Sequence, residues 1–335
     1  MTTAAVIGVG AMGQHHARVY NEMEDVQLVA VADPDPVRRA AAERRFGVPA
    51  FADHTVLLAE LRPELVSVVV PSVHHHAVTM AALAHGVHVL VEKPIAGTLA
   101  EAEEILAEAE ARGLLLTVGH VERFNPAVME LKRRLDAGDL GRIFHLQARR
   151  LSPFPAYVRD VGVVIDLATH ELDIFRYLLG GQPVERVFAE TGRNVHERYE
   201  DMLFASLRFA NGVLGVLDIN WLTPTKIREL RITGERGMFL VDYLNQDLYF
   251  YENSIAPSQW DAMALFKGVE EGNVMKIRVA KSEPLRGELR AFVDAVATGA
   301  PLVVTGLDGL QALVLAKALL RSAAEGLVVR GDSGN

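Results

Sequence analysis

A glycine-rich turn near the amino end is the feature that most restricts how this chain can fold. The turn reads Gly8-Val9-Gly10-Ala11-Met12-Gly13 and lies between an apolar run and a stretch with helical character. Strand, glycine turn and helix in this order are typical of an α/β unit that holds a pyrophosphate at the amino end of the helix. Gly8 permits the tight turn, Gly10 lets phosphates approach the main chain, and Gly13 lets helix and strand pack closely. Alone, the motif is weak evidence, because glycine recurs in many loops.

A second apolar run, residues 26–32, strengthens this interpretation because it ends at Asp33, twenty residues after Gly13. A carboxylate at this position can accept hydrogen bonds from both ribose hydroxyls of adenosine and would repel a 2'-phosphate. We therefore predict an NAD site, with NADP the less favoured cofactor although Arg38 lies nearby. The alternative is a glycine turn with a purely structural role.

Length and composition favour a globular protein of two domains. The chain has 335 residues, of which 50% are hydrophobic and 23% charged, so each of two domains can bury a core. Its net charge of −9 argues against a nucleic-acid partner, and the absence of cysteine excludes disulfides and zinc–thiolate sites. The first core strand starts almost at once and no apolar run could span a bilayer, so we expect a cytoplasmic protein with no membrane partner.

The first third of the chain alternates apolar strands with helices. Helices are expected at residues 36–45, 54–61, 75–85 and 99–112, and buried strands at 65–70, 87–91 and 114–118. Continuous apolar strands separated by helices are typical of a parallel sheet that is covered on both faces. This pattern predicts a Rossmann domain over residues 1–121 that binds NAD.

The pattern changes after residue 121. Strands that alternate in polarity are expected at residues 184–191, 202–209, 213–221, 226–233, 238–242 and 248–252. Helices are expected at residues 126–135, 165–179, 284–298 and 307–325. Turns such as Asn211-Gly212 indicate hairpins in an antiparallel sheet with one exposed face. We predict a second α/β domain over residues 122–335 that binds the substrate and forms subunit contacts.

The carboxyl ends of the parallel strands carry the first group of candidate site residues. Strands of a parallel sheet all end at one edge, where a dinucleotide lies. Besides the glycine turn and Asp33, this rule brings together Pro71, Ser72, His75, Glu92, Lys93 and His120. Lys93 is the reactive member, because its amine can hydrogen-bond a substrate oxygen and stabilise charge that develops there. The alternative is a surface lysine before a proline turn.

A second group is the pair Asp166 and His170, which are four residues apart and so project from one helix face. A carboxylate beside an imidazole fixes its tautomer and raises its basicity, as expected of a general base. Oxidation of an alcohol needs such a base to remove the hydroxyl proton. The pair could instead be a helical hydrogen bond without catalytic duty. A metal site lacks a compact third ligand, so we expect none.

Four further residues are candidates for contacts with a substrate. Arg123 could bind an anionic substrate or form an ion pair within the protein. Tyr157, Arg159 and Trp221 are candidate substrate-wall residues from the second domain, and Trp221 is an equally good core residue. A serine-hydrolase elbow and a P-loop are both absent from the sequence.

Taken together, these motifs resemble those of the Gfo/Idh/MocA oxidoreductases, the superfamily of glucose–fructose oxidoreductase and inositol dehydrogenase. The resemblance extends over essentially the whole chain. Besides the glycine turn, it is carried by Pro71-Ser72-Val73-His74-His75, Glu92-Lys93-Pro94 and Asp166-Leu167-Ala168-Thr169-His170. One departure is Ser72, where many members have asparagine, which changes a contact available on the nicotinamide side.

The resemblance implies an NAD-dependent sugar dehydrogenase. Its implied fold is a Rossmann domain followed by an α/β domain with a large open antiparallel sheet, which often packs against another subunit in a homodimer or homotetramer. It assigns the family's lysine to Lys93 and the family's aspartate and histidine to Asp166 and His170.

Residues 118–126, 220–228 and 237–243 are similar to members that oxidise the 3-hydroxyl of UDP-N-acetylglucosamine. A nearer alternative is an inositol or free-sugar dehydrogenase. The alternative of another class is a non-catalytic NAD(P) sensor.

Overall fold

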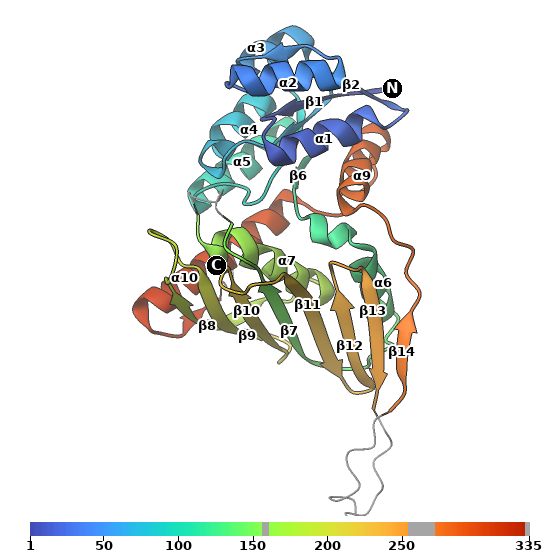
Figure 1. The fold of residues 1–335 in the computed structure, drawn as a ribbon, viewed down its shortest axis with the longest axis vertical. Coiled ribbons are helices and arrows are strands. Elements are labelled where there is room, and N and C mark those ends of the chain that lie inside the picture. The colour runs from blue at the N-terminus through green and yellow to red at the C-terminus, as the bar shows by residue number, and fades with distance from the viewer. Residues whose placement is uncertain (156–160, 254–271, 332–335) are drawn as a thin grey trace, which may run out of the picture. The chain divides into compact units, whose positions relative to one another are not determined.

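The chain divides into two compact units. A computed structural model describes residues 1–155, 161–253 and 272–331 (Figure 1). One unit comprises Met1–Phe124 with Ser282–Val314, and the other comprises Asn125–Lys281 with Leu315–Asn335. The expected domain boundaries had placed residues 282–314 in the second domain, whereas the structure packs them with the Rossmann strands. The predicted fold class, a parallel sheet followed by a mostly antiparallel one, is confirmed.

The first unit is built on a six-stranded parallel sheet in the order β3-β2-β1-β4-β5-β6. Its strands are β1 (Thr2–Ile7), β2 (Val26–Ala32), β3 (Ala50–Phe51), β4 (Leu65–Val68), β5 (His88–Val91) and β6 (Leu116–Val118). The strand order reverses between β1 and β4, so their carboxyl ends diverge and leave a crevice there. All six residues of β1 except Thr3 are buried, which explains its continuous apolar pattern.

The helices of this unit begin and end where the sequence indicates. They are α1 (Ala11–Asn21), α2 (Pro36–Phe46), α3 (His54–Leu61), α4 (His75–Ala84) and α5 (Leu99–Arg112), with short 3₁₀ turns η1 (Ser72–His74) and η2 (Val121–Phe124). Thr98 and Glu101 form a reciprocal capping box at the start of α5, and Gly113 ends it in the left-handed conformation. The Asp35 carboxylate caps α2 in the same way that the Asp53 carboxylate caps α3.

Helix α9 (Pro284–Thr298) completes the core of the first unit although it comes late in the chain. It lies beside α1 (Figure 1), and its Leu289, Phe292 and Val293 are fully buried in the same apolar cluster as Tyr20. That cluster also includes Val19 of α1 and Val26 of β2. The Rossmann sheet therefore depends on a segment that the amino-terminal third does not contain.

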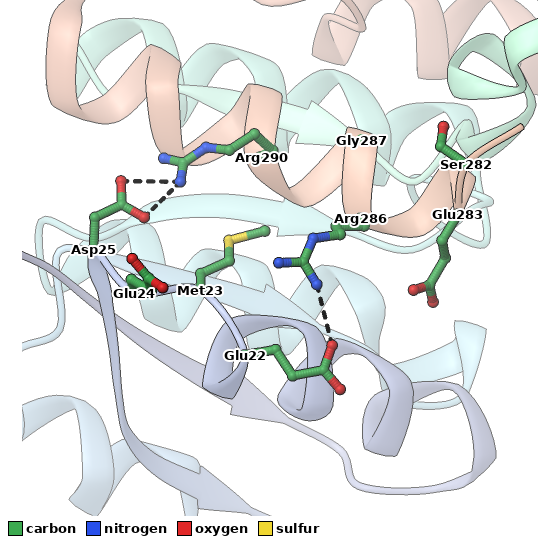
Figure 2. Close-up of a pocket in the computed structure, with 9 residues that line it drawn as sticks. All are labelled: Glu22, Met23, Glu24, Asp25, Ser282, Glu283, Arg286, Gly287 and Arg290. Atoms are coloured by element: carbon green, nitrogen blue, oxygen red, sulfur yellow. Dashed lines mark hydrogen bonds and ion pairs between the residues drawn. The ribbon is translucent and has the colours of Figure 1, made fainter. Parts of the chain in front are cut away.

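Ion pairs reinforce this contact and line a polar pocket of about 510 Å³ (Figure 2). The Arg290 guanidinium lies 2.6 Å from the Asp25 carboxylate, and Arg286 lies 3.2 Å from Glu22. Since Asp25 precedes β2, this pocket lies at the amino edge of the sheet. That edge is opposite the strand ends where a dinucleotide binds. We attribute the pocket to the packing of α9.

The second unit contains a nine-stranded sheet in the order β14-β13-β12-β11-β7-β10-β9-β8-β15. Its strands are β7 (Ile143–Leu151), β8 (Val184–Gly192), β9 (Met202–Phe209), β10 (Leu214–Asn220), β11 (Ile227–Gly234), β12 (Gly237–Asp242), β13 (Asp247–Glu252), β14 (Val274–Ile277) and β15 (Val329–Arg330). All neighbours are antiparallel except β7 and β10, which run parallel. The sequence analysis did not predict β7, although it lies at the centre of the sheet.

Among the residues that the structure describes, helices cover one face of this sheet and none covers the other, which we call the open face. The covering elements are α6 (Pro126–Asp136), a π-helical turn η3 (Val164–Ala168), α7 (Thr169–Leu178) and the second half of α10 (Gly306–Glu325) (Figure 1). Burial alternates along β8, β9 and β10, as a sheet with one covered face requires. Side chains on the open face include Phe188, Phe204 and Val216, each at least 36% exposed.

Candidate active site

A pocket of about 660 Å³ follows the carboxyl ends of β1, β2 and β4 in the first unit. Its lining includes Gly8, Gly10, Ala11, Met12, Asp33, Arg38, Pro71 and His74. Thirteen of its eighteen lining residues are apolar or glycine, and the carboxylate of Asp33 at the end of β2 is buried. Both its position at the reversal of strand order and its lining fit a dinucleotide.

Each glycine of the turn meets a different constraint. Gly8 has a φ of +91°, and a Cβ built on it would lie 2.4 Å from the carbonyl oxygen of Val69. A Cβ on Gly13 would lie 1.8 Å from the carbonyl oxygen of Gly8, so α1 packs on the turn only without a side chain there. Around Gly10 the nearest atom to such a Cβ is 3.8 Å away, which leaves the main chain open to a phosphate.

Asp33 is bound to the glycine turn by a direct hydrogen bond. Its Oδ2 accepts the Val9 N–H at 2.9 Å, and its Oδ1 accepts the Asp35 N–H at 2.9 Å. The Arg38 guanidinium lies 3.8 Å from the same carboxylate and is half-exposed at the pocket wall. Asp33 therefore both fixes the turn and presents a negative charge where adenosine ribose would bind.

The Glu92-Lys93-Pro94 segment follows β5, and the Glu92 side chain is 13% exposed. Glu92 Oε1 lies 3.2 Å from Nε2 of the fully buried His16, and Glu92 Oε2 accepts the Lys93 N–H at 3.2 Å. Burial alone would raise the pKa of Glu92, but the hydrogen bond with His16 and the nearby positive charge of Lys93 hold it below its ordinary value. Lys93 itself is partly exposed at this edge of the sheet.

His75 and His120 are buried residues of the same unit. The His75 ring has Nδ1 2.6 Å from the carbonyl oxygen of Pro94 and Nε2 2.9 Å from that of Val70. The ring thus joins the end of β4 to the loop after β5. Burial lowers the pKa of His75, although both carbonyl contacts oppose that shift. His120 is 2% exposed, and Ser72 begins the 3₁₀ turn η1.

In the second unit, Asp166 and His170 lie on successive turns of one helical segment. Asp166 belongs to the π-helical turn η3 and His170 to the first turn of α7. Both residues are partly exposed, whereas Ala168 and Thr169 between them are buried. That the two side chains act together remains a prediction from their spacing. π-Helical turns inside helices are frequent at functional sites.

A buried ion pair anchors this segment to the sheet. Arg150 on β7 places Nε 2.6 Å from Oε1 of Glu171, and the two side chains are 3% and 0% exposed. The Tyr243 hydroxyl donates to the other carboxylate oxygen at 3.1 Å, and the Arg150 guanidinium lies 5.6 Å from the centre of the Tyr243 ring. Since Glu171 directly follows His170, this contact fixes the main chain that carries the imidazole.

A second carboxylate holds the start of the same segment. Glu200 accepts the Val164 N–H with its side chain at 3.1 Å and the Val163 N–H with its main-chain oxygen at 3.0 Å. Burial raises the pKa of Glu200, and the main-chain N–H groups oppose this shift. Two of the N–H groups at the start of η3 therefore have acceptors on Glu200.

The four candidates for substrate contact have different outcomes. Arg123 forms an ion pair with Asp308 at 2.9 Å and donates to the carbonyl oxygen of Val303, in agreement with the ion-pair alternative. Trp221 is 1% exposed and packs edge-on against Phe154, as a core residue does. Tyr157 and Arg159 lie outside the described residues.

Two observations concern other kinds of site. Residues 1–155, 161–253 and 272–331 contain no group of three or more His, Asp or Glu side chains that could hold a metal ion. Over the same ranges, the helices are all too short or too polar to cross a bilayer.

The sequence analysis missed His16, Arg150, Glu171 and Tyr243. A usable signal existed for two of them. His16 lies on the apolar stripe of α1 between Gly13 and Tyr20, and Glu171 lies on that of α7. A charged or polar residue on such a stripe indicates a buried partner.

Comparison with known proteins places the chain among oxidoreductases. A family model described as oxidoreductase family, NAD-binding Rossmann fold, matches residues 2–120, and one for the GFO/IDH/MocA C-terminal domain matches residues 128–240. The chain is 32% identical over 326 residues to UDP-N-acetylglucosamine 3-dehydrogenase of Acidithiobacillus ferrooxidans, covering 97% of this chain and 98% of that protein.

Two further similarities are comparable in extent. Inositol 2-dehydrogenase 2 of Saccharopolyspora erythraea is 31% identical over 332 residues, covering 96% of this chain and 93% of that protein. A solved structure of UDP-N-acetylglucosamine 3-dehydrogenase from A. ferrooxidans superposes with a TM-score of 0.86 at 29% identity, covering 96% and 97% of the two chains.

Proposed function

Because this chain belongs to the Gfo/Idh/MocA family of NAD-dependent oxidoreductases, we propose that it oxidises a ring hydroxyl of a nucleotide sugar to a ketone. UDP-N-acetylglucosamine, oxidised at its 3-hydroxyl, is the first candidate substrate. The family, the oxidoreductase class and the NAD cofactor predicted from the motifs are confirmed by the matches. The observation that carries the substrate proposal is the 32% identity to a UDP-N-acetylglucosamine 3-dehydrogenase over nearly the full length of both chains.

The residues of the first unit fit the cofactor. The open main chain at Gly10 and the amino end of α1 would hold the pyrophosphate, and Asp33 would hold the adenosine ribose. When bound, NAD supplies the acceptor for the hydride that leaves the carbinol carbon. Pro71, Ser72 and His120 belong to the same edge of the sheet and are proposed for its nicotinamide half.

In the proposed reaction, three side chains assist removal of the proton from the substrate hydroxyl. Lys93 donates a hydrogen bond to the hydroxyl oxygen and stabilises its developing negative charge. His170 takes the hydroxyl proton, and Asp166 stabilises the imidazolium that results. Lys93 and His170 act on the proton as a coupled pair, so the pH profile belongs to both.

A substrate screen tests this proposal. NADH formation is followed by absorbance with UDP-N-acetylglucosamine, other UDP-sugars, myo-inositol and free hexoses. We expect turnover with UDP-N-acetylglucosamine, and a decrease of about 10² or more in Lys93→Ala and His170→Ala with NAD affinity nearly unchanged. The exposed Lys281→Ala is the matched control. Wild-type turnover in both site variants would refute the roles given to Lys93 and His170.

The same screen separates two other functions. Turnover with myo-inositol and none with UDP-sugars would favour an inositol dehydrogenase, a function supported by the 31% identity to inositol 2-dehydrogenase 2. NAD binding without turnover on any polyol or sugar would favour a non-catalytic sensor. Against the sensor, Lys93, Asp166 and His170 are all present.

We further propose that the enzyme is a cytoplasmic homodimer or homotetramer formed through the open face of its nine-stranded sheet. Three neighbouring strands, β8, β9 and β10, place Phe188, Phe204, Leu214 and Val216 on that face, 36–49% exposed. Exposed apolar side chains in contiguous rows are typical of an interaction surface. Light scattering with size-exclusion chromatography tests the proposal, and a monomer at micromolar concentration would contradict it.

A further inference from the structure

His16 is a buried polar side chain that the reaction proposed above does not use. It lies on α1, three residues after Gly13, and its side chain has no exposed surface. Within the described parts of the chain its Nδ1 has no hydrogen-bond partner, whereas Nε2 lies 3.2 Å from Glu92 Oε1. Burying an imidazole is unfavourable unless it is hydrogen-bonded. The contact with Glu92 is therefore the interaction that accounts for a histidine at this position.

Glu92 is held on three sides at the carboxyl end of β5. Its N–H donates to the carbonyl oxygen of Val68 at 3.0 Å, which continues the pairing with β4. Its carboxylate packs directly against Gly119. A Cβ at that position would lie only 2.9 Å from the carboxylate carbon, so the absence of a side chain leaves room for Glu92. The carboxylate is thus directed between α1 and the end of β6, and one oxygen returns to the Lys93 N–H.

This arrangement links His16 to Lys93 through two successive hydrogen bonds. The ring of His16 donates to one oxygen of Glu92, and the other oxygen accepts from the main chain of Lys93. The titratable groups that act on the Glu92 carboxylate are His16 on α1, His75 on α4 and Lys93 beside it. His16 therefore helps to fix where the carboxylate points, at the residue next to Lys93.

We propose that His16 is a positioning residue for Lys93 and acts through the Glu92 carboxylate, an inference that rests on the proposed role of Lys93. The imidazole donates to Glu92 Oε1 and holds that oxygen on the side of α1. Without it, Glu92 would lack a donor at Oε1 and would direct more negative charge toward Lys93. The amine would then keep its proton to higher pH. Because Lys93 and His170 act on the substrate proton as a coupled pair, oxidation would need a higher pH to reach half its maximal rate.

The test compares two substitutions of His16 with one of its neighbour. His16→Leu keeps a similar volume and removes the donor, His16→Gln replaces it with an amide donor, and His15→Leu alters an exposed position of the same helix. Two profiles are measured against pH. One is kcat for oxidation, and the other is the rate at which acetic anhydride labels the Lys93 amine, followed by mass spectrometry of its peptide. The second needs no substrate.

For His16→Leu we expect the midpoints of both profiles to move up by about one pH unit, with KM for NAD changed less than about twofold. His16→Gln should recover most of the shift, and His15→Leu should match the wild type. Unchanged profiles in His16→Leu, or a Gln variant that behaves like the Leu variant, would overturn the inference.

Glu92→Gln provides an independent arm should His16→Leu not fold. It removes the negative charge at nearly constant volume, so both midpoints should move to lower pH. A Glu92→Gln variant with unmoved midpoints would also overturn the inference. If the wild-type protein oxidises none of the substrates screened, the proposed function fails. The labelling profile of Lys93 still decides the role of His16.

Discussion

The buried pair of Arg150 and Glu171 provides a quantitative test of how the second unit holds its candidate catalytic helix. Arg150→Met keeps an unbranched, flexible side chain but removes the charge and the donors of the guanidinium. The Glu171 carboxylate, 0% exposed, then loses the guanidinium 2.6 Å away and keeps the Tyr243 hydroxyl. We expect a large loss of stability in the second unit and a decrease in kcat, because Glu171 directly follows His170.

Two independent estimates of this loss agree. Opposite unit charges about 4 Å apart interact by about 4 kcal/mol at an effective dielectric constant of about 20. Removing one partner of a buried pair costs about 3–5 kcal/mol, because the other charge remains buried without compensation. Replacing both residues with apolar side chains removes both charges, so Arg150→Met/Glu171→Met should recover most of this loss.

Urea unfolding followed by tryptophan fluorescence measures these free energies in the second unit. Trp221 and Trp260, the two tryptophans of the chain, both fall in its range Asn125–Lys281. The double-mutant cycle isolates the coupling between the two side chains from their separate effects on packing. A loss below about 1 kcal/mol in Arg150→Met, the value typical of an exposed pair, would refute the reasoning. The reasoning would also be refuted if the double variant lost as much unfolding free energy as the two single variants together.

Three further predictions concern the first unit. Gly13→Ala should weaken NAD binding by about tenfold or more in a fluorescence titration, because its Cβ would lie 1.8 Å from the Gly8 carbonyl oxygen. An unchanged affinity would contradict the packing of α1 on the turn. Asp33→Asn should raise the ratio of kcat/KM for NADP over NAD by about tenfold, since it removes the charge that repels a 2'-phosphate, and a constant ratio would show that Asp33 does not select the cofactor. Thr98→Ala should cost about 1 kcal/mol in urea unfolding followed by circular dichroism, because it removes the capping box of α5, and wild-type stability would show that the cap contributes nothing.

Helices and the parallel strands were predictable because local patterns specify them. Residues 54–61, 99–112 and 284–298 were predicted as helices with the bounds that the structure has, since caps, glycines and prolines mark their ends. The strand β7 was not predicted. Its adjacent Arg149 and Arg150 obscure the alternation, because Arg150 points to the covered face and is buried by a partner on another element.

The site residues also fall into those that a local motif predicts and those that only the fold brings together. Motif spacing indicates that Asp33, Lys93 and the glycine turn lie at one edge of a sheet, because parallel strands end together. Pairing between elements has no local pattern. Nothing near His16 in the chain identifies Glu92 as its partner, and the Asp308 partner of Arg123 comes from the far end of the sequence. Such contacts follow from the fold and cannot be predicted before it.

The place of α9 in the core of the first unit has a consequence for synthesis on the ribosome. The six parallel strands are synthesised early. Leu289, Phe292 and Val293, which pack against α1, are synthesised only after residues 125–281 of the second unit. Until then the apolar side of α1 in the nascent first unit remains exposed to water and to chaperones. The product of a gene fragment that stops after the sixth parallel strand would lack α9. Its apolar surface on α1 would remain exposed, and we expect it to aggregate.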